Sequence, residues 1–141
     1  MYKSTIMRLL GIDYGMARIG LAFTDTSLDL ILPLDAIDAK TIEDLFGFIQ
    51  DIVVERHIDT VVVGLPLGID ASETAQSKHT RSFISQLNSV LDIDIVTIDE
   101  SFSSVEAKTY LSGDMYKSQS SGRLDSASAC VILNRFLKQT G

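Results

Sequence analysis

Hydrophobic and polar residues alternate along the first forty positions in the way that short strands require. One apolar run covers residues 7–13, and the next segment alternates Ile19, Leu21 and Phe23 with smaller residues. A third run follows at residues 30–37. Alternation with a period of two predicts strands, and the short turns between these runs predict antiparallel neighbours.

The spacing of apolar residues changes to that of a helix from residue 41 onward. Apolar side chains recur three or four positions apart over residues 42–53, and we expect this helix to end near His57. We attribute His57 to the dipole at the helix C-terminus or to a surface contact, and not to catalysis. The β-branched run at residues 60–64 then predicts a central strand that is buried on both faces.

Helix and strand patterns continue through the second half of the chain. A helix is expected to start around residues 70–72, and a strand follows at residues 93–98. Capping-box spacing predicts a short helix over about residues 103–111. Residues 112–122 are rich in Ser and Gly and predict a loop, and the last helix is expected over about residues 124–137.

This order of elements predicts an α/β fold. Three strands in a meander, followed by strands that helices connect, give a mixed sheet with helices on its faces. The helix-linked strands should be parallel, with right-handed crossovers. The chain has 141 residues, which suits a single domain over residues 1–141 with a core of its own.

Composition and charge narrow the classes of function. The chain is 45% hydrophobic and 22% charged, as in soluble globular proteins. No apolar stretch approaches the roughly 20 residues that span a bilayer, so we expect no membrane partner and a cytoplasmic location. The single cysteine, Cys130, lies in an apolar run and predicts core packing. A net charge of −7 argues against coating of duplex nucleic acid, because that affinity comes from Lys and Arg. The oligomeric state is not predicted.

Three carboxylates stand where predicted elements end or begin. Asp13 ends the first strand, Glu100 follows the strand at residues 93–98, and Asp125 opens the last helix. Any one of them could simply cap a turn or a helix, or lie solvated at a strand end. If they converge, their mutual repulsion requires a cation, and oxygen ligands without His or Cys favour Mg²⁺ or Mn²⁺. Such a cluster usually serves phosphoryl transfer with two ions.

Several short segments carry a resemblance that covers nearly the whole chain. They are Gly11-Ile12-Asp13-Tyr14-Gly15 with Arg18-Ile19-Gly20-Leu21-Ala22, Val63-Gly64-Leu65-Pro66-Leu67, Asp99-Glu100 with Ser104-Val105-Glu106-Ala107, and Leu124-Asp125-Ser126-Ala127-Ser128-Ala129. In this order they resemble the YqgF/RuvX family, which is described as pre-16S rRNA nucleases and formerly as Holliday junction resolvases. The segment before Met7 is expected to be a frayed extension, and a start at Met7 would leave the resemblance intact.

The resemblance implies a fold and a metal site. Its fold is RNase H-like, as in RuvC-type resolvases, with a five-stranded mixed sheet of order 3-2-1-4-5 and helices on both faces. Asp13, Glu100 and Asp125 fall on the three acidic positions of the family. They are therefore expected to be catalytic and to bind Mg²⁺ or Mn²⁺ as two ions, with Asp13 bridging.

Cations near these acids are expected to contact the phosphates of the substrate. We assign this role to Arg18, His79 and Arg81, although a solvated helix face explains the last two as well. The family usually carries Arg directly after its second acid, whereas this chain has Ser101. A phosphate contact or an ion pair for Glu100 is therefore missing here or supplied from elsewhere.

These features favour a metal-dependent endonuclease that hydrolyses phosphodiester bonds in structured RNA, in the 5′-end maturation of pre-16S rRNA. Two alternatives are a Holliday junction resolvase that acts on branched DNA and a non-catalytic RNA-binding factor in ribosome assembly. A nucleotide-binding phosphotransferase of the actin-like class is another, because Asp13-Tyr14-Gly15 resembles the first phosphate loop of that class. Those proteins duplicate the domain, and 141 residues hold one copy.

Overall fold

The computed structural model describes residues 6–100 and 121–140, with the backbone alone at residues 69, 121–125 and 140. Its five-stranded sheet has the order β3-β2-β1-β4-β5, which confirms the predicted order 3-2-1-4-5. Strands β1, β2 and β3 form an antiparallel meander, and β4 and β5 are parallel to β1. The strands are β1 (Arg8–Asp13), β2 (Arg18–Asp25), β3 (Ile31–Asp38), β4 (Thr60–Leu65) and β5 (Asp94–Asp99).

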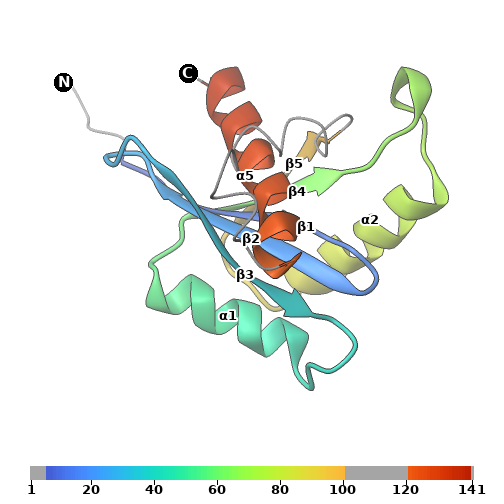
Figure 1. Cartoon of the computed structure of the whole chain (residues 1–141), viewed down its shortest axis with the longest axis horizontal. Coiled ribbons are helices and arrows are strands. Elements are labelled where there is room, and N and C mark those ends of the chain that lie inside the picture. Colours follow the sequence, from blue (N-terminus) through green and yellow to red (C-terminus); the bar gives the residue numbers. More distant parts are fainter. Residues whose placement is uncertain (1–5, 101–120, 141) are drawn as a thin grey trace.

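Helices cover both faces of this sheet, with α1 and α2 on one face and α5 on the other (Figure 1). The alternation of strand β1 accounts for the two cores, because Leu10 and Ile12 pack toward α1 and α2 while Leu9 packs toward α5. No described helix is long and apolar enough to cross a membrane. The helical elements are α1 (Leu45–Glu55), the 3₁₀ turn η1 (Ile69–Ala71), α2 (Ala75–Asn88) and α5 (Ser121–Thr140).

Helix α5 lies directly against the middle of the sheet. A β-carbon at Gly11 of strand β1 would stand 2.7 Å from Leu133 Cγ and 2.9 Å from the Ala129 carbonyl oxygen. One turn earlier, the buried hydroxyl of Ser126 accepts a hydrogen bond of 3.1 Å from the Leu21 N–H. Leu21 lies where the β2–β3 register shifts, so a side chain of α5 satisfies a strand donor at an irregular point of the sheet.

The ends of the helices differ from those that the sequence predicted. Helix α1 begins only after Asp44, whose side chain accepts from the Gly47 N–H. Helix α2 begins at Ala75 rather than around residues 70–72, because Thr74 and Ser77 form a reciprocal capping box. Residues 70 and 71 have positive φ and belong to a turn.

The last helix is longer than predicted, and it begins within the predicted loop. Helix α5 starts at Ser121, so the end of the loop expected at residues 112–122 is helical. Asp125 therefore lies inside the helix and does not open it. The helix predicted at residues 103–111 lies outside the described residues.

We predict that Ser126→Ala will lower the free energy of unfolding by about 1–3 kcal/mol, because it leaves the buried Leu21 N–H without its acceptor. Urea denaturation measures the change. Ser85→Ala on the exposed face of α2 is the control for the higher helix propensity of alanine. If the two variants unfold at the same urea concentration, the hydroxyl of Ser126 does not stabilise the fold.

Candidate functional site

Three parallel strands place their carboxyl ends at one edge of the sheet. Asp13 is the last residue of β1, and Glu100 follows the last residue of β5. Strand β4 lies between them, with Val63 paired to Ile12 on one side and Gly64 paired to Ile98 on the other. Continuing the β1–β4 register by one residue puts Asp13 beside Gly64.

The carboxylate of Glu100 lies over the end of strand β4. Its backbone N–H donates to the Leu65 carbonyl oxygen at 3.2 Å, which fixes the main chain just beyond β5. A β-carbon placed on Gly64 would be 3.0 Å from both Cδ and Oε2 of Glu100. The same β-carbon would meet Ile132 of α5, so the carboxylate lies on the face of the sheet that α5 covers. Only 9% of the Glu100 surface is exposed.

The side chain of Asp13 emerges on this same face. Positions 11 and 13 share a face because strand residues alternate, and the Gly11 position faces α5. Tyr14 turns to the opposite face, where its ring stacks on Phe83 of helix α2 with centroids 4.4 Å apart. This stacking holds the chain immediately after Asp13.

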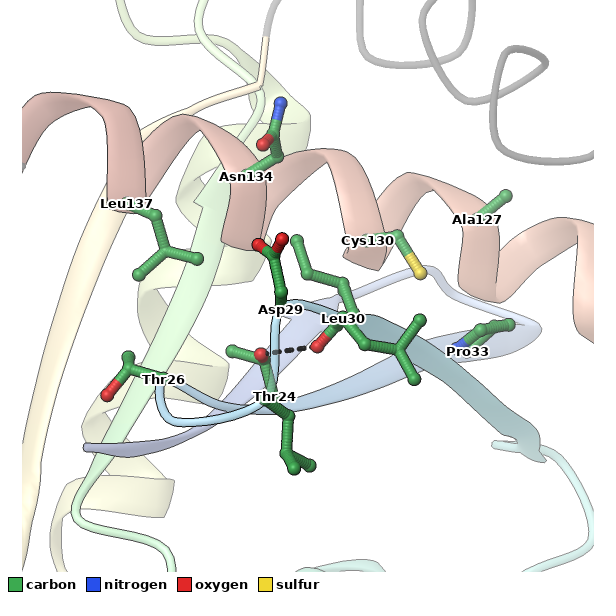
Figure 2. Close-up of a pocket in the computed structure, with 11 residues that line it drawn as sticks. Thr24, Thr26, Asp29, Leu30, Pro33, Ala127, Cys130, Asn134 and Leu137 are labelled. Carbon is green, nitrogen blue, oxygen red and sulfur yellow. Dashed lines mark hydrogen bonds between the residues drawn. The ribbon is translucent and has the colours of Figure 1, made fainter. Parts of the chain in front are cut away.

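The backbone of Asp125 comes over the same end of the sheet. Helix α5 runs antiparallel to β1, since Leu137 lies beside Thr26 near the start of β1 (Figure 2). The Ala129 carbonyl lies against Gly11, and Asp125 is four residues earlier, about 6 Å along the helix. Two strand residues, from position 11 to position 13, cover a similar distance of about 6.6 Å. The side chain of Asp125 lies outside the described part of the structure.

The donor set suits a hard divalent cation. Asp13 and Glu100 offer only oxygen, which favours Mg²⁺ or Mn²⁺ over zinc. Glu100 is buried, and a buried carboxylate is stable in its charged form only with a positive charge or hydrogen-bond donors close by. Within residues 6–100 and the described side chains of α5, no three His, Cys, Asp or Glu side chains form a metal cluster. A site with three carboxylates therefore needs an acid outside these described side chains, as predicted for Asp125.

The predicted phosphate-binding cations occupy two places. Arg18 begins strand β2 two residues before Gly20, the partner of Asp13, and so lies at the edge that carries the acids. His79 is on the exposed side of α2. Arg81, also on α2, donates from Nε and Nη2 to the two carboxylate oxygens of Glu73 at 2.9 and 2.7 Å. A phosphate would have to compete with Glu73 for this guanidinium.

Sequence reasoning missed a cation beside the second acid. The Nη1 of Arg135 in α5 donates to the Asp99 carbonyl oxygen at 2.7 Å, immediately before Glu100. Arg135 follows Asn134 and interrupts an apolar run, so its polarity is visible in the sequence. No local pattern connects it to a strand end 36 residues earlier.

A separate cavity of about 560 Å³ lies between α5 and the β2–β3 hairpin (Figure 2). Thr24 and Leu30 line it and are joined by a hydrogen bond of 2.7 Å from Thr24 Oγ1 to the Leu30 carbonyl. Cys130 also lines it, and burial raises the pKa of its thiol to about 12. The predicted core position of Cys130 is confirmed, and among the described side chains neither Asp13 nor Glu100 lines this cavity.

Two solved structures that resemble this one are complexes with Holliday junctions. Over 96% of both chains, the structure matches "T. thermophilus RuvC in complex with Holliday junction substrate" with a TM-score of 0.59 at 12% identity. It matches the Fowlpox virus resolvase, in a complex with Holliday junction DNA, with a TM-score of 0.60 at 13% identity over 95% of this chain and 99% of that one. The fold is therefore the RNase H-like fold of RuvC-type resolvases.

Sequence comparison identifies the family. The family model described as "RuvX: Holliday junction resolvase" matches residues 7–139, and the chain belongs to this family. A "Putative pre-16S rRNA nuclease" from Anaeromyxobacter sp. (strain Fw109-5) is 36% identical over 93% of this chain and 96% of its own length. A protein of the same name from Chlorobium phaeobacteroides (strain BS1) is 36% identical over 100% and 99%.

We predict that the carboxyl group of Glu73 titrates with a pKa of about 2, because hydrogen bonds from Arg81 and Ser77 stabilise its charged form. Arg81→Gln should move this pKa toward 4.5, the ordinary value for Glu. Carbon NMR of the side-chain carboxyl over a pH titration measures both values. The ion pair stabilises the fold above pH 4.5, and its contribution is lost as the pH falls toward 2. An unchanged Glu73 pKa in the variant would show that Arg81 is free to bind phosphate.

Proposed function

We propose that this protein is a metal-dependent endonuclease that cleaves structured RNA in the 5′-end maturation of pre-16S rRNA. One observation carries the chemical part of this proposal. The carboxylate of Glu100 is buried against Gly64, on the strand next to the one that ends at Asp13, and on the same face of the sheet. Membership of the RuvX family supports the proposal that acids at these strand ends serve hydrolysis of a phosphodiester bond.

Each acid has a distinct task in this site. Asp13 would hold both ions from the central strand, and Glu100 and Asp125 would complete their coordination. Mg²⁺ or Mn²⁺, when bound, supplies a Lewis acid that activates water and stabilises the leaving oxygen. Two carboxylates about 4 Å apart repel by about 4 kcal/mol at an effective dielectric of 20, so the empty arrangement is unfavourable.

The surrounding residues orient the substrate. Arg18 lies at the same edge as Asp13 and contacts a phosphate next to the scissile one. His79 and Arg81 extend this contact along α2, where Arg81 exchanges Glu73 for a phosphate oxygen. The net charge of −7 limits affinity for duplex surfaces, so binding depends on these local contacts.

Cleavage of branched DNA is the second candidate, and the structural neighbours favour it. Both solved resolvases are complexes with Holliday junctions, whereas the curated relatives are named as rRNA nucleases. RNA and DNA present the same phosphodiester to the three acids. Cleavage of a pre-16S rRNA fragment and of a four-way DNA junction, measured at one Mn²⁺ concentration, separates the two functions.

We predict that Asp13→Asn abolishes hydrolysis and leaves the fold intact, because an amide of nearly equal volume replaces a charged metal ligand. Glu100→Gln and Asp125→Asn should act in the same way. Rates of cleavage and circular dichroism measure the two effects. Asp51→Asn on the exposed side of α1 is the matched control and should retain full activity. Wild-type turnover by any one of the three variants would remove that residue from the set of essential ligands.

We also predict that millimolar Mg²⁺ or Mn²⁺ raises the melting temperature and that Asp13→Asn largely removes this response. A cation that binds only the folded protein adds about 2.7 kcal/mol at a hundredfold excess over its dissociation constant. Without metal, the asparagine variant should be at least as stable as wild type, because one repulsive charge is gone. Melting curves with EDTA and with Mg²⁺ test this. Equal metal-induced shifts in both proteins would place the ions elsewhere.

A further inference from the structure

We propose that Gly64 is a positioning residue for Glu100, because its missing side chain provides the space in which the Glu100 carboxylate lies. This inference rests on the proposed function, in which Glu100 is a metal ligand. Strand β4 is buried along its whole length, and its residues 62 and 64 both face α5. Val62 fills its position with a branched side chain, whereas position 64 is left to Glu100 and Ile132.

The backbone at Gly64 does not require glycine for its own conformation. The φ angle of Gly64 is one that any L-residue can adopt. Gly64 also keeps the regular pairing between β4 and β5, where it lies opposite Ile98. The requirement is steric. A β-carbon would stand 3.0 Å from both Cδ and Oε2 of Glu100, and it would also collide with Cδ1 of Ile132.

Hydrogen bonds on either side of the Asp99–Glu100 peptide restrain the main chain of Glu100. Its N–H is bonded to the Leu65 carbonyl, and the carbonyl of the preceding Asp99 accepts from Arg135. The side chain is then the part of Glu100 that must shift away from a β-carbon at position 64. A methyl group at position 64 therefore displaces the carboxylate while leaving the acid, its charge and the other ligands in place.

A second role for Gly64 must be separated from this one. Ile132 of α5 packs on the same spot, so a larger residue could act only by disturbing the helix. Ile132→Val removes the Cδ1 atom that would collide and keeps the β-branched shape. In the Ile132→Val protein, the new methyl group of Gly64→Ala therefore meets only the carboxylate of Glu100 among these two neighbours. Ile132→Val alone is the matched control.

The experiment measures Mn²⁺ binding to the full chain by isothermal titration calorimetry, without substrate. We expect Gly64→Ala with Ile132→Val to bind Mn²⁺ about 10- to 100-fold more weakly than Ile132→Val alone, as is usual when a residue that orients a ligand is changed. Urea denaturation in EDTA should give similar midpoints for the two proteins. Equal Mn²⁺ affinities would overturn the proposal.

A compensating variant tests the direction of the effect. Glu100→Asp draws the carboxylate back by one methylene and should weaken Mn²⁺ binding in the Ile132→Val protein. In the protein that also carries Gly64→Ala, the same change should restore part of the affinity, because the shorter acid avoids the new methyl group. Additive losses would mean that residues 64 and 100 do not act on each other.

Two further outcomes are decisive. If Gly64→Ala with Ile132→Val fails to fold, addition of Glu100→Asp should recover folding, and failure of this triple variant overturns the proposal. Glu100→Gln in the Ile132→Val protein tests the proposed function by itself. Undiminished Mn²⁺ binding there would refute Glu100 as a ligand, whereas a loss there without a loss from Gly64→Ala would refute only the role of Gly64.

Discussion

Helix α5 approaches strand β1 so closely that residue 11 has no room for a side chain, with Leu133 Cγ 2.7 Å from where a β-carbon would be. The height of α5 above the sheet follows from this contact. The same helix then reaches β2 through Ser126, β4 through Ile132 and the end of β5 through Arg135. A larger residue at position 11 would lift the helix that carries the third acid away from the strand ends. The position of Asp125 over the strand ends therefore depends on a contact about one turn away along α5.

Much of the fold could be predicted because its signals are local. The alternation of Ile19, Leu21 and Phe23 and the β-branched run in β4 identified strands that the structure contains. Neighbouring relationships are not local, and the strand order came from the resemblance to a family. Helix ends were predicted less well. At the start of α2, the reciprocal bonds of Thr74 and Ser77 outweigh the turn residues that precede them.

The site divides in the same way. The strand-end positions of Asp13 and Glu100 could be predicted from the sequence, because a charged residue that follows an apolar run marks the end of a strand. Gly64 and Arg135 could not, since their importance lies in what touches them across the fold. Arg81 shows that a cation predicted to bind phosphate can already have a partner in the fold. It is an exposed cation on α2, but Glu73 already engages its guanidinium with two hydrogen bonds.

The long separation between Leu21 and Ser126 has a consequence for synthesis of the chain. The meander of β1, β2 and β3 contains local pairings and can form early. Strands β4 and β5 can then pair onto this meander as they are synthesised. Helix α5 follows all five strands in the chain, yet its Ser126 bonds to a strand residue 105 positions upstream. A nascent chain thus carries Asp13 and Glu100 before the helix with Asp125 can dock. Until α5 docks, the Leu21 N–H lacks the Ser126 hydroxyl that accepts from it in the folded protein, so the strand that carries Leu21 is completed by the far end of the chain.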